Sequence, residues 1–210
     1  MNFGFLLFNN LEEVDFVGPW EMFNAWREYS NGPKSCVTVA EKQEAIKCVN
    51  GLSIVPDFQF SDCPPLDYLL VPGGVGTRKE LVNEPLIQFV QQQASTCKYV
   101  LSVCTGSLIL QAAGLLQGKK ATTYWSCLSE LQEQGDVSIV EERFVRDGKI
   151  WTAAGVSAGI DMALAFIADQ AGEDTAGKVQ LYTEYYPSTV KYGRAHLSER
   201  VPEYIKLELD

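Results

Sequence analysis

The chain has 210 residues, 46% of them apolar, and its 17 basic and 27 acidic residues give a formal net charge of −10. This length and composition predict one globular domain with a substantial core and exclude a disordered chain. The negative charge disfavours sequence-independent electrostatic binding to nucleic-acid phosphate backbones, so we expect no nucleic-acid partner.

The chain opens on a short apolar run, 3–8, that predicts a first β-strand. No basic segment precedes this run, and Glu12, Glu13 and Asp15 follow it closely. This arrangement favours a strand over a secretory signal peptide. No apolar stretch approaches the roughly 18 to 20 residues that span a bilayer, so we also expect no membrane partner.

Strand-like runs then alternate with helical patterns. Such alternation predicts an α/β fold with a mostly parallel sheet covered by helices on both faces. Two segments, 44–60 and 137–153, are typical of hairpins with turns at 50–51 and 147–148. The predicted strands are 3–8, 36–40, 68–71, 99–103 and 150–153, and the predicted helices are 18–29, 85–95, 106–115, 126–134, 158–171 and 174–185.

Only the end of the chain loses clear periodicity. The sequence shows no internal repeat, low-complexity segment or linker before that point. We therefore expect one domain over 1–186 and a C-terminal tail over 187–210 that wraps the surface or a partner subunit.

The cysteines form no recognisable metal or disulfide pattern. They are scattered without CxxC spacing, which predicts reduced thiols, no bound metal and a cytoplasmic protein. The six residues are Cys36, Cys48, Cys63, Cys97, Cys104 and Cys127.

Cys104 has the most distinctive surroundings of these cysteines. It lies in the stretch VLSVCTGSLILQAAGLL, where an apolar run meets Gly106 and then a helical pattern. This pattern predicts a strand, a sharp turn and a helix, which is the geometry of a nucleophile elbow. A helix N-terminus favours thiolate over thiol, so Cys104 is a candidate nucleophile. A buried core cysteine is the alternative.

Two further segments are expected beside Cys104, because ligands of open α/β sheets collect at the carboxyl ends of the strands. One is the glycine-rich turn VPGGVGTR, which follows the run 68–71. It lacks the spacing of a phosphate-binding loop. Its Gly74 could supply one N–H of an oxyanion hole, with the N–H of Thr105 as the other, or the segment could be a plain turn.

The second segment is NNLEEVDFVGPWE, which follows the first strand. Its Asp15 lies in an apolar context and is a candidate acid/base, and Glu21 could share that role. A surface aspartate or helix cap is the alternative for Asp15.

Histidine is nearly absent, and this absence restricts the chemistry. The one histidine, His196, lies in the polar tail, so a Cys-His dyad is not expected. Amide hydrolysis must protonate a departing amine, a task that histidine usually performs. An addition reaction without an amine to expel therefore suits this chain better.

Four ordered motifs resemble the ThiJ/PfpI family, which has the class I glutamine amidotransferase-like fold. The likeness runs over about 3–186 and is strongest to the isocyanide hydratase (isonitrile hydratase) branch of the family. The motifs are DFVGPWEMF (15–23), DCPPLDYLLVPGG (62–74), SVCTGSLILQAAGLLQGKKATTYW (102–125) and AGID (158–161).

The resemblance implies a flavodoxin-like three-layer sandwich, a homodimer and a lyase that hydrates organic isocyanides, a small-molecule substrate, to formamides without a cofactor. Carried over by motif, the nucleophile is Cys104, its neighbour is Thr105, the acid/base is Asp15 and the oxyanion-side glycine is Gly74. One departure concerns specificity, since relatives commonly have histidine where this chain has Tyr124. A thiol-based redox or ligand sensor, or a cysteine amidase or peptidase, are the alternative functions.

Overall fold

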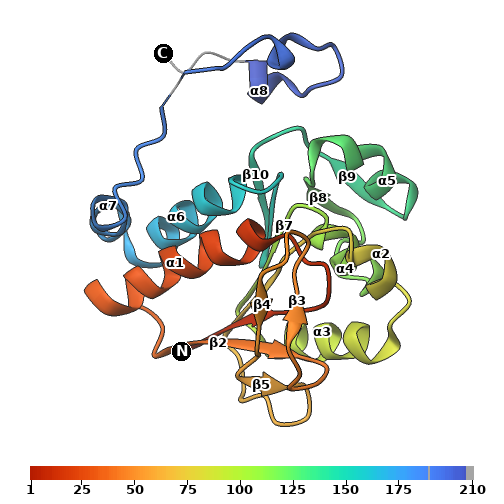
Figure 1. The fold of residues 1–210 in the computed structure, drawn as a ribbon, viewed down its shortest axis with the longest axis vertical. Coiled ribbons are helices and arrows are strands. Elements are labelled where there is room, and N and C mark those ends of the chain that lie inside the picture. Colours follow the sequence, from red (N-terminus) through yellow and green to blue (C-terminus); the bar gives the residue numbers. More distant parts are fainter. Residues whose placement is uncertain (189, 207–210) are drawn as a thin grey trace.

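The computed structural model describes residues 1–188 and 190–206 as a layered α/β structure (Figure 1). The strands are β1 (Asn2–Leu6), β2 (Ser35–Ala40), β3 (Ile46–Lys47), β4 (Ser53–Ile54), β5 (Phe58–Gln59), β6 (Tyr68–Val71), β7 (Tyr99–Val103), β8 (Lys119–Ala121), β9 (Val137–Ile139), β10 (Phe144–Asp147) and β11 (Ile150–Ala153). The helices are α1 (Glu13–Tyr29), α2 (Thr77–Glu80), α3 (Glu84–Thr96), α4 (Gly106–Ala112), α5 (Leu128–Glu133), α6 (Ala158–Ala171), α7 (Glu173–Tyr182) and α8 (Glu203–Lys206), with 3-10 turns η1 (Trp125–Cys127) and η2 (Ala195–Leu197).

A seven-stranded sheet forms the middle layer, in the order β10-β11-β7-β6-β1-β2-β5. Every pairing is parallel except that of β10 with β11. Helices α1, α6 and α7 pack together on one face, and α3 and α4 lie on the other (Figure 1). The predicted three-layer α/β sandwich is therefore confirmed.

Aromatic packing holds α1 on the sheet. The ring centroids of Phe3 on β1 and Phe23 on α1 are 4.1 Å apart, and Phe166 on α6 meets Phe23 edge-on at 5.8 Å. All three side chains are fully buried, and such pairs add about 0.5 to 1.5 kcal/mol each beyond their area burial. Nearer the carboxyl end of β1, Phe5 meets Phe16 in the first part of α1 edge-on at 5.7 Å, which holds the start of α1 beside that end of the strand.

The start of α1 corrects one prediction. The sequence pattern placed the helix over 18–29, but it begins at Glu13 and contains Pro19. Proline prefers the first helical turn, but Pro19 lies in the second turn of α1. In the structure the acidic side chains of Glu13 and Asp15 occupy the first turn, where the helix dipole favours negative charge.

Both predicted hairpins form in part. β3 pairs antiparallel with β4 across the turn at 50–51, and β10 pairs antiparallel with β11 across the turn at 147–148. The other strands of these two segments do not join the hairpins. β5 joins the edge of the main sheet, and β9 pairs with β8 in a separate two-stranded sheet. The other predicted strands and helices agree with the structure to within a few residues.

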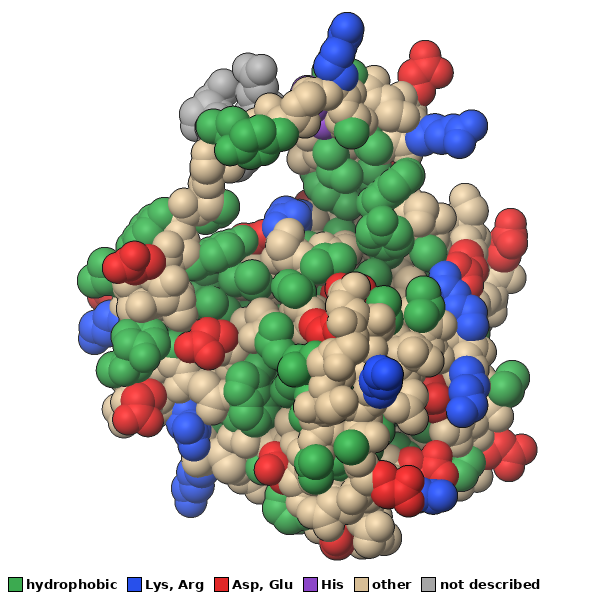
Figure 2. All heavy atoms as spheres, in the orientation of Figure 1, with side chains coloured by type: hydrophobic (Ala, Val, Ile, Leu, Met, Phe, Trp, Pro, Cys, Tyr) green, Lys and Arg blue, Asp and Glu red, His purple; other side chains and the backbone are tan. Residues whose placement is uncertain are grey.

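The chain after α7 runs away from the other helices and forms η2 and α8 apart from the sheet (Figure 1). Figure 2 shows hydrophobic side chains where this segment meets the rest of the molecule, and Trp125, Val201 and Ile205 line one cavity there. The predicted division at residue 186 stays a prediction, and residues 189 and 207–210 of the predicted tail lie outside the described residues. Within the described ranges, every helix is too short or too polar to cross a bilayer.

Candidate active site

The carboxyl ends of β1, β6 and β7 bring three turns together. These strands are neighbours, because β6 pairs with both β1 and β7. The backbone N–H of Gly73 donates to Oδ2 of Asp15 at 2.9 Å, and that of Gly74 donates to Oγ1 of Thr105 at 3.0 Å. The structure therefore places Asp15, Gly74, Thr105 and Cys104 at one edge of the sheet.

Cys104 occupies a tight turn between β7 and α4. Its backbone is left-handed, with φ of 54°, a conformation that costs energy for a residue other than glycine. Its N–H donates to the carbonyls of Ala153 and Ala154 at 3.1 and 3.0 Å, which holds the turn against β11. The side chain is 7% exposed, at the edge of a pocket.

Gly106 allows the turn to approach the neighbouring strand. A Cβ at this position would lie 2.2 Å from the carbonyl oxygen of Val71, so no larger residue fits without a backbone shift. The carbonyl of Cys104 accepts from the hydroxyls of Thr123 at 2.9 Å and Ser107 at 3.1 Å. The sequence pattern did not single out Thr123 or Ser107, because a hydroxyl that bonds the backbone leaves no periodic signal.

Asp15 is a fully buried carboxyl group in the first turn of α1. Its Oδ1 has no hydrogen-bond partner within residues 1–188 and 190–206. Burial raises the pKa of Asp15 to about 7, and the charge of Glu12 adds to this effect. This rise in pKa is partly offset by hydrogen bonds from the Gly73 N–H, the Cys104 thiol and the Val156 N–H, each of which lowers the pKa of Asp15.

The Cys104 thiol also has a raised pKa. Burial is the main cause and the charge of Asp15 is the second, while the N–H and hydroxyl of Thr105 and the N–H of Val156 lower it. The expected preference of the helix N-terminus for thiolate is therefore outweighed by burial in this resting arrangement. Cys104 and Asp15 together form a pair that holds one negative charge more readily than two.

Val156 contributes to both members of this pair. It lies between β11 and α6 with a left-handed backbone, φ 49°. Its N–H lowers the pKa of Asp15 and the pKa of Cys104. A valine in this conformation is unusual because its branched side chain crowds the backbone. No signal in the sequence marks such a valine.

The thiol opens into a pocket of about 580 Å³. Tyr124 forms part of its wall. Three further lining residues, Arg78, Cys127 and Val156, were not predicted from sequence. The full lining is Glu12, Gly74, Val75, Arg78, Cys104, Thr105, Tyr124, Ser126, Cys127 and Val156.

The other acid/base candidates lie elsewhere. Glu21 is exposed on α1 and does not line the pocket, whereas Glu12 does. His196 belongs to η2 and lines a different cavity, with Trp125 and Ile205. Within the described part of the chain, the pocket of Cys104 therefore contains carboxyl, hydroxyl, thiol and guanidinium groups but no imidazole.

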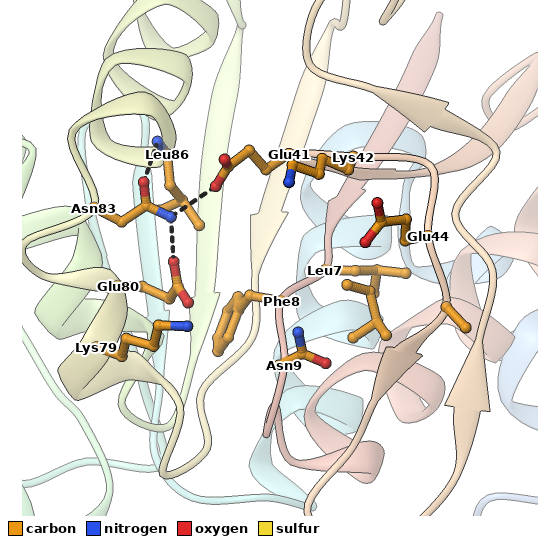
Figure 3. Close-up of a pocket in the computed structure, with 12 residues that line it drawn as sticks. Leu7, Phe8, Asn9, Glu41, Lys42, Glu44, Lys79, Glu80, Asn83 and Leu86 are labelled. Carbon is orange, nitrogen blue, oxygen red and sulfur yellow. Dashed lines mark hydrogen bonds between the residues drawn. The ribbon is translucent and has the colours of Figure 1, made fainter.

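A second cavity, of about 270 Å³, lies between the loop after β2 and the helices α2 and α3 (Figure 3). The amide of Asn83 bridges its two walls by donating to Glu80 at 2.6 Å and to Glu41 at 3.0 Å. None of the predicted site residues lines this cavity. Among the described residues, no group of three or more His, Cys, Asp or Glu side chains could hold a metal ion.

Comparison with known proteins identifies several relatives. Residues 2–169 match the model of the DJ-1/PfpI family. The chain is 41% identical over 189 residues to isonitrile hydratase from Pseudomonas putida, and the match covers 90% of this chain and 80% of that one. It is 29% identical to the HTH-type transcriptional regulator GbdR of Pseudomonas aeruginosa, of which it spans 48%. A crystal structure of a ThiJ/PfpI family protein from Pseudomonas syringae superimposes with a TM-score of 0.85 at 34% identity, covering 98% of this chain and 82% of that one.

Proposed function

Because this chain belongs to the DJ-1/PfpI family, we propose that it is a lyase that hydrates organic isocyanides to N-substituted formamides, with Cys104 as the nucleophile. The observation that carries the proposal is the pairing of Cys104 with the fully buried carboxyl group of Asp15, where Cys104 lines a pocket with no histidine in its described lining. The similarity to isonitrile hydratase over most of the chain supports the same reaction.

The first half of the reaction forms a carbon–sulfur bond. Sγ of Cys104 attacks the terminal carbon of R–N≡C while Asp15 takes up the thiol proton. Asp15 then gives that proton to the same carbon, which produces the thioimidate R–N=CH–S–Cys. A carboxyl group whose pKa is about 7 suits both transfers, because it is ready to accept and to donate near neutral pH.

The second half consumes water. Asp15 accepts a proton from water as the oxygen adds to the thioimidate carbon, and the carbon–sulfur bond then breaks. The two protons of the water end on nitrogen and sulfur, so R–NH–CHO leaves and the thiol is restored. No electrons are transferred at any step, so the chemistry calls for no redox cofactor.

The groups around sulfur stabilise its charge when it attacks and when it leaves. The Thr105 N–H and hydroxyl and the Val156 N–H all favour negative charge on Cys104. The N–H of Gly74 is engaged by Oγ1 of Thr105, so we assign Gly74 the role of holding that hydroxyl in place. This differs from the oxyanion donor expected from sequence.

Incubation with an aryl isocyanide tests the function directly. Formamide is followed by absorbance, with Cys104→Ala as the control. Saturable turnover above that control is expected, and its absence across aryl and alkyl isocyanides would overturn the proposal. The alternative, a thiol-based redox or ligand sensor, would become oxidised or bind its ligand without such turnover.

We also propose a cytoplasmic homodimer, as the family resemblance and the free thiols of all six cysteines support. Sedimentation at micromolar concentration should show a species of about twice the chain mass of 23.3 kDa. A species near the chain mass alone would contradict the dimer.

A further inference from the structure

A chain of hydroxyl groups extends from Cys104 into the protein, and its second member is Thr77. Thr77 begins α2 and is fully buried, although it does not line the pocket. Its Oγ1 lies 3.3 Å from Oγ1 of Thr105 and donates to the carbonyl of Gly74 at 2.8 Å. Nη1 of Arg78 donates to the same Oγ1 at 3.2 Å.

The hydroxyl proton of Thr105 has two competing acceptors. One is Sγ of the adjacent Cys104, because the Thr105 hydroxyl lowers the pKa of this thiol. The other is the carbonyl of Gly74, at 3.2 Å. Because a hydroxyl has one proton, it can serve only one of these acceptors at a time.

Thr77 decides this competition by occupying the carbonyl. Both its N–H, at 3.2 Å, and its hydroxyl, at 2.8 Å, donate to the oxygen of Gly74, which has two lone pairs. The Gly74 N–H fills an acceptor position on Oγ1 of Thr105. The Thr105 proton is then left with sulfur as its open acceptor.

The Thr77 hydroxyl proton has two acceptors, and the Gly74 carbonyl at 2.8 Å is nearer than Oγ1 of Thr105 at 3.3 Å. The guanidinium of Arg78 donates to Oγ1 of Thr77, so that oxygen must direct its own proton elsewhere. Nε and Nη2 of Arg78 are held by Glu130 at 3.1 and 2.5 Å, and Nη2 also contacts Sγ of Cys127 at 3.2 Å. The hydroxyl chain is therefore anchored to α5 at its far end.

We propose that Thr77 is a positioning residue that directs the hydroxyl proton of Thr105 onto Sγ of Cys104. This inference rests on the proposed role of Cys104 as nucleophile. Without the Thr77 hydroxyl, the Thr105 proton turns to the carbonyl of Gly74, and the sulfur loses a donor when it becomes negative. Hydrogen bonds to charged groups are about twice as strong as neutral ones, so the loss falls on the thiolate and spares the thiol.

The rate of Cys104 alkylation by iodoacetamide measures this effect without any hydration substrate. The rate constant is followed from pH 5 to 10 by mass spectrometry of the peptide that contains Cys104, because five other cysteines are present. Between pH 5 and 10 the rate constant rises with the fraction of thiolate, so Thr77→Val should lower it about tenfold at each pH in this range, the loss that corresponds to a thiol pKa one unit higher. Thr77→Ser, which keeps the hydroxyl, should restore the parent rate. Neither variant removes a charge, since Asp15, Glu12 and Arg78 remain.

A double substitution separates positioning from a general structural effect. Thr105→Val alone should also slow alkylation, and adding Thr77→Val to it should change the rate less than twofold, because the group through which Thr77 acts is already absent. Thr38→Val is the matched control. Thr38 is a buried threonine of β2 whose hydroxyl donates to Asp57 at 2.8 Å, so its loss should lower Tm without changing the Cys104 rate.

Two outcomes would overturn the proposal. One is a parent-like alkylation rate in Thr77→Val, and the other is an equal slowing by Thr77→Val with and without the Thr105 hydroxyl. A thermal melt shows whether each variant is folded. Thr77→Ala, which also removes the hydroxyl and should slow alkylation about tenfold, carries the test if Thr77→Val is not folded. Failure of the proposed hydratase function is separate, because it would appear as missing formamide in the parent while the alkylation rates still report on Thr77.

Discussion

The carboxyl group of Asp15 faces the thiol of Cys104 in a space where neither group reaches bulk water freely. Asp15 is fully buried and Cys104 is 7% exposed, and the charge of Asp15 raises the pKa of the thiol. Like charges in one buried site oppose each other, so the pair works with one negative charge and passes one proton between its members. The first three predictions follow from this relationship.

Asp15→Asn should abolish most hydration and leave Cys104 able to react. Asparagine keeps a similar shape and can accept from the Gly73 N–H, but it cannot cycle a proton. Loss of an acid/base group typically costs about 10² to 10⁴ in rate, so we expect formamide production to fall at least about 10²-fold. Iodoacetamide should still alkylate Cys104. Parent-like hydration by Asp15→Asn would show that Asp15 has only a structural role.

The activity of the parent should depend on pH through the same carboxyl group. Below a pH of about 7 both members of the pair are protonated, and no base is available to take the thiol proton. The ratio kcat/KM should therefore rise with pH, with a midpoint of about 7, and level off above it. The measurement is formamide production at low substrate concentration in buffers of constant ionic strength. A profile that is flat from pH 5.5 to 8.5 would contradict the assignment.

Asp15 should also make the fold less stable as the pH rises. Its pKa is 3.8 in an ordinary environment and about 7 in the folded protein, so between these values the folded state binds more protons than the unfolded state. Stability contributed by this group is thus highest below pH 4 and is lost as the pH rises to about 7. Asp15→Asn removes the cost of burying the charge and should stabilise the fold by roughly 2 to 4 kcal/mol at pH 8. Thermal melts at pH 5 and 8 test this, since the gain should be clearly smaller at pH 5.

Gly73→Ala should damage the site more than its small size suggests. A Cβ there would lie 2.5 Å from the backbone nitrogen of Thr105 and 2.8 Å from Oδ2 of Asp15. Both groups must move, and a displacement of about 1 Å can cost about 10² in rate. Overpacking should also cost about 1 to 3 kcal/mol of stability.

Gly177→Ala is the matched control for this substitution. Gly177 lies on α7, and a Cβ there would meet nothing within 4 Å. Because alanine favours a helix over glycine by up to about 1 kcal/mol, this variant should melt slightly higher and keep parent activity. Full activity in Gly73→Ala, measured beside it, would show that the close approach of the turn after β6 to Thr105 is not required.

The fold was largely predictable because its central strands are buried apolar runs bounded by turns. The bounds of β6, β7 and β11 agree with the sequence prediction at both ends. The start of α1 was not, because its first turn carries acidic side chains, whereas a Gly-Pro pair later in the helix resembles a start signal. Short elements such as α2 and β8 were missed because four or three residues are too few to show a period.

The site was also predictable from the sequence only in part. Asp15, Gly74, Thr105 and Cys104 could be brought together from sequence, because each follows a strand whose neighbours in the sheet could be inferred. Arg78 and Thr77 could not, since they come from the unpredicted α2. The left-handed backbone of Val156 also carries no signal, because the residue is not a glycine.

Tyr124 should set which isocyanides the enzyme prefers. Its side chain forms part of the pocket wall and packs so closely on Gly155 that a Cβ there would lie 2.3 Å from Cδ2 of the ring. Tyr124→His places a smaller ring on this wall, and the space gained should favour bulky aryl over small alkyl isocyanides. A pocket contact of this kind discriminates by about 1 to 3 kcal/mol, so the aryl-to-alkyl ratio of kcat/KM should rise about tenfold.

The rate of Cys104 alkylation should not change, because Tyr124 is expected to contact the substituent of the substrate and not the sulfur of Cys104. Tyr186→His, at a tyrosine that is 61% exposed and outside the pocket, is the control and should leave the ratio unaltered. If the ratio is the same in Tyr124→His and Tyr186→His, the substituent on nitrogen does not contact this wall, and specificity must come from Val75, Ser126 or Cys127 on the other sides of the pocket.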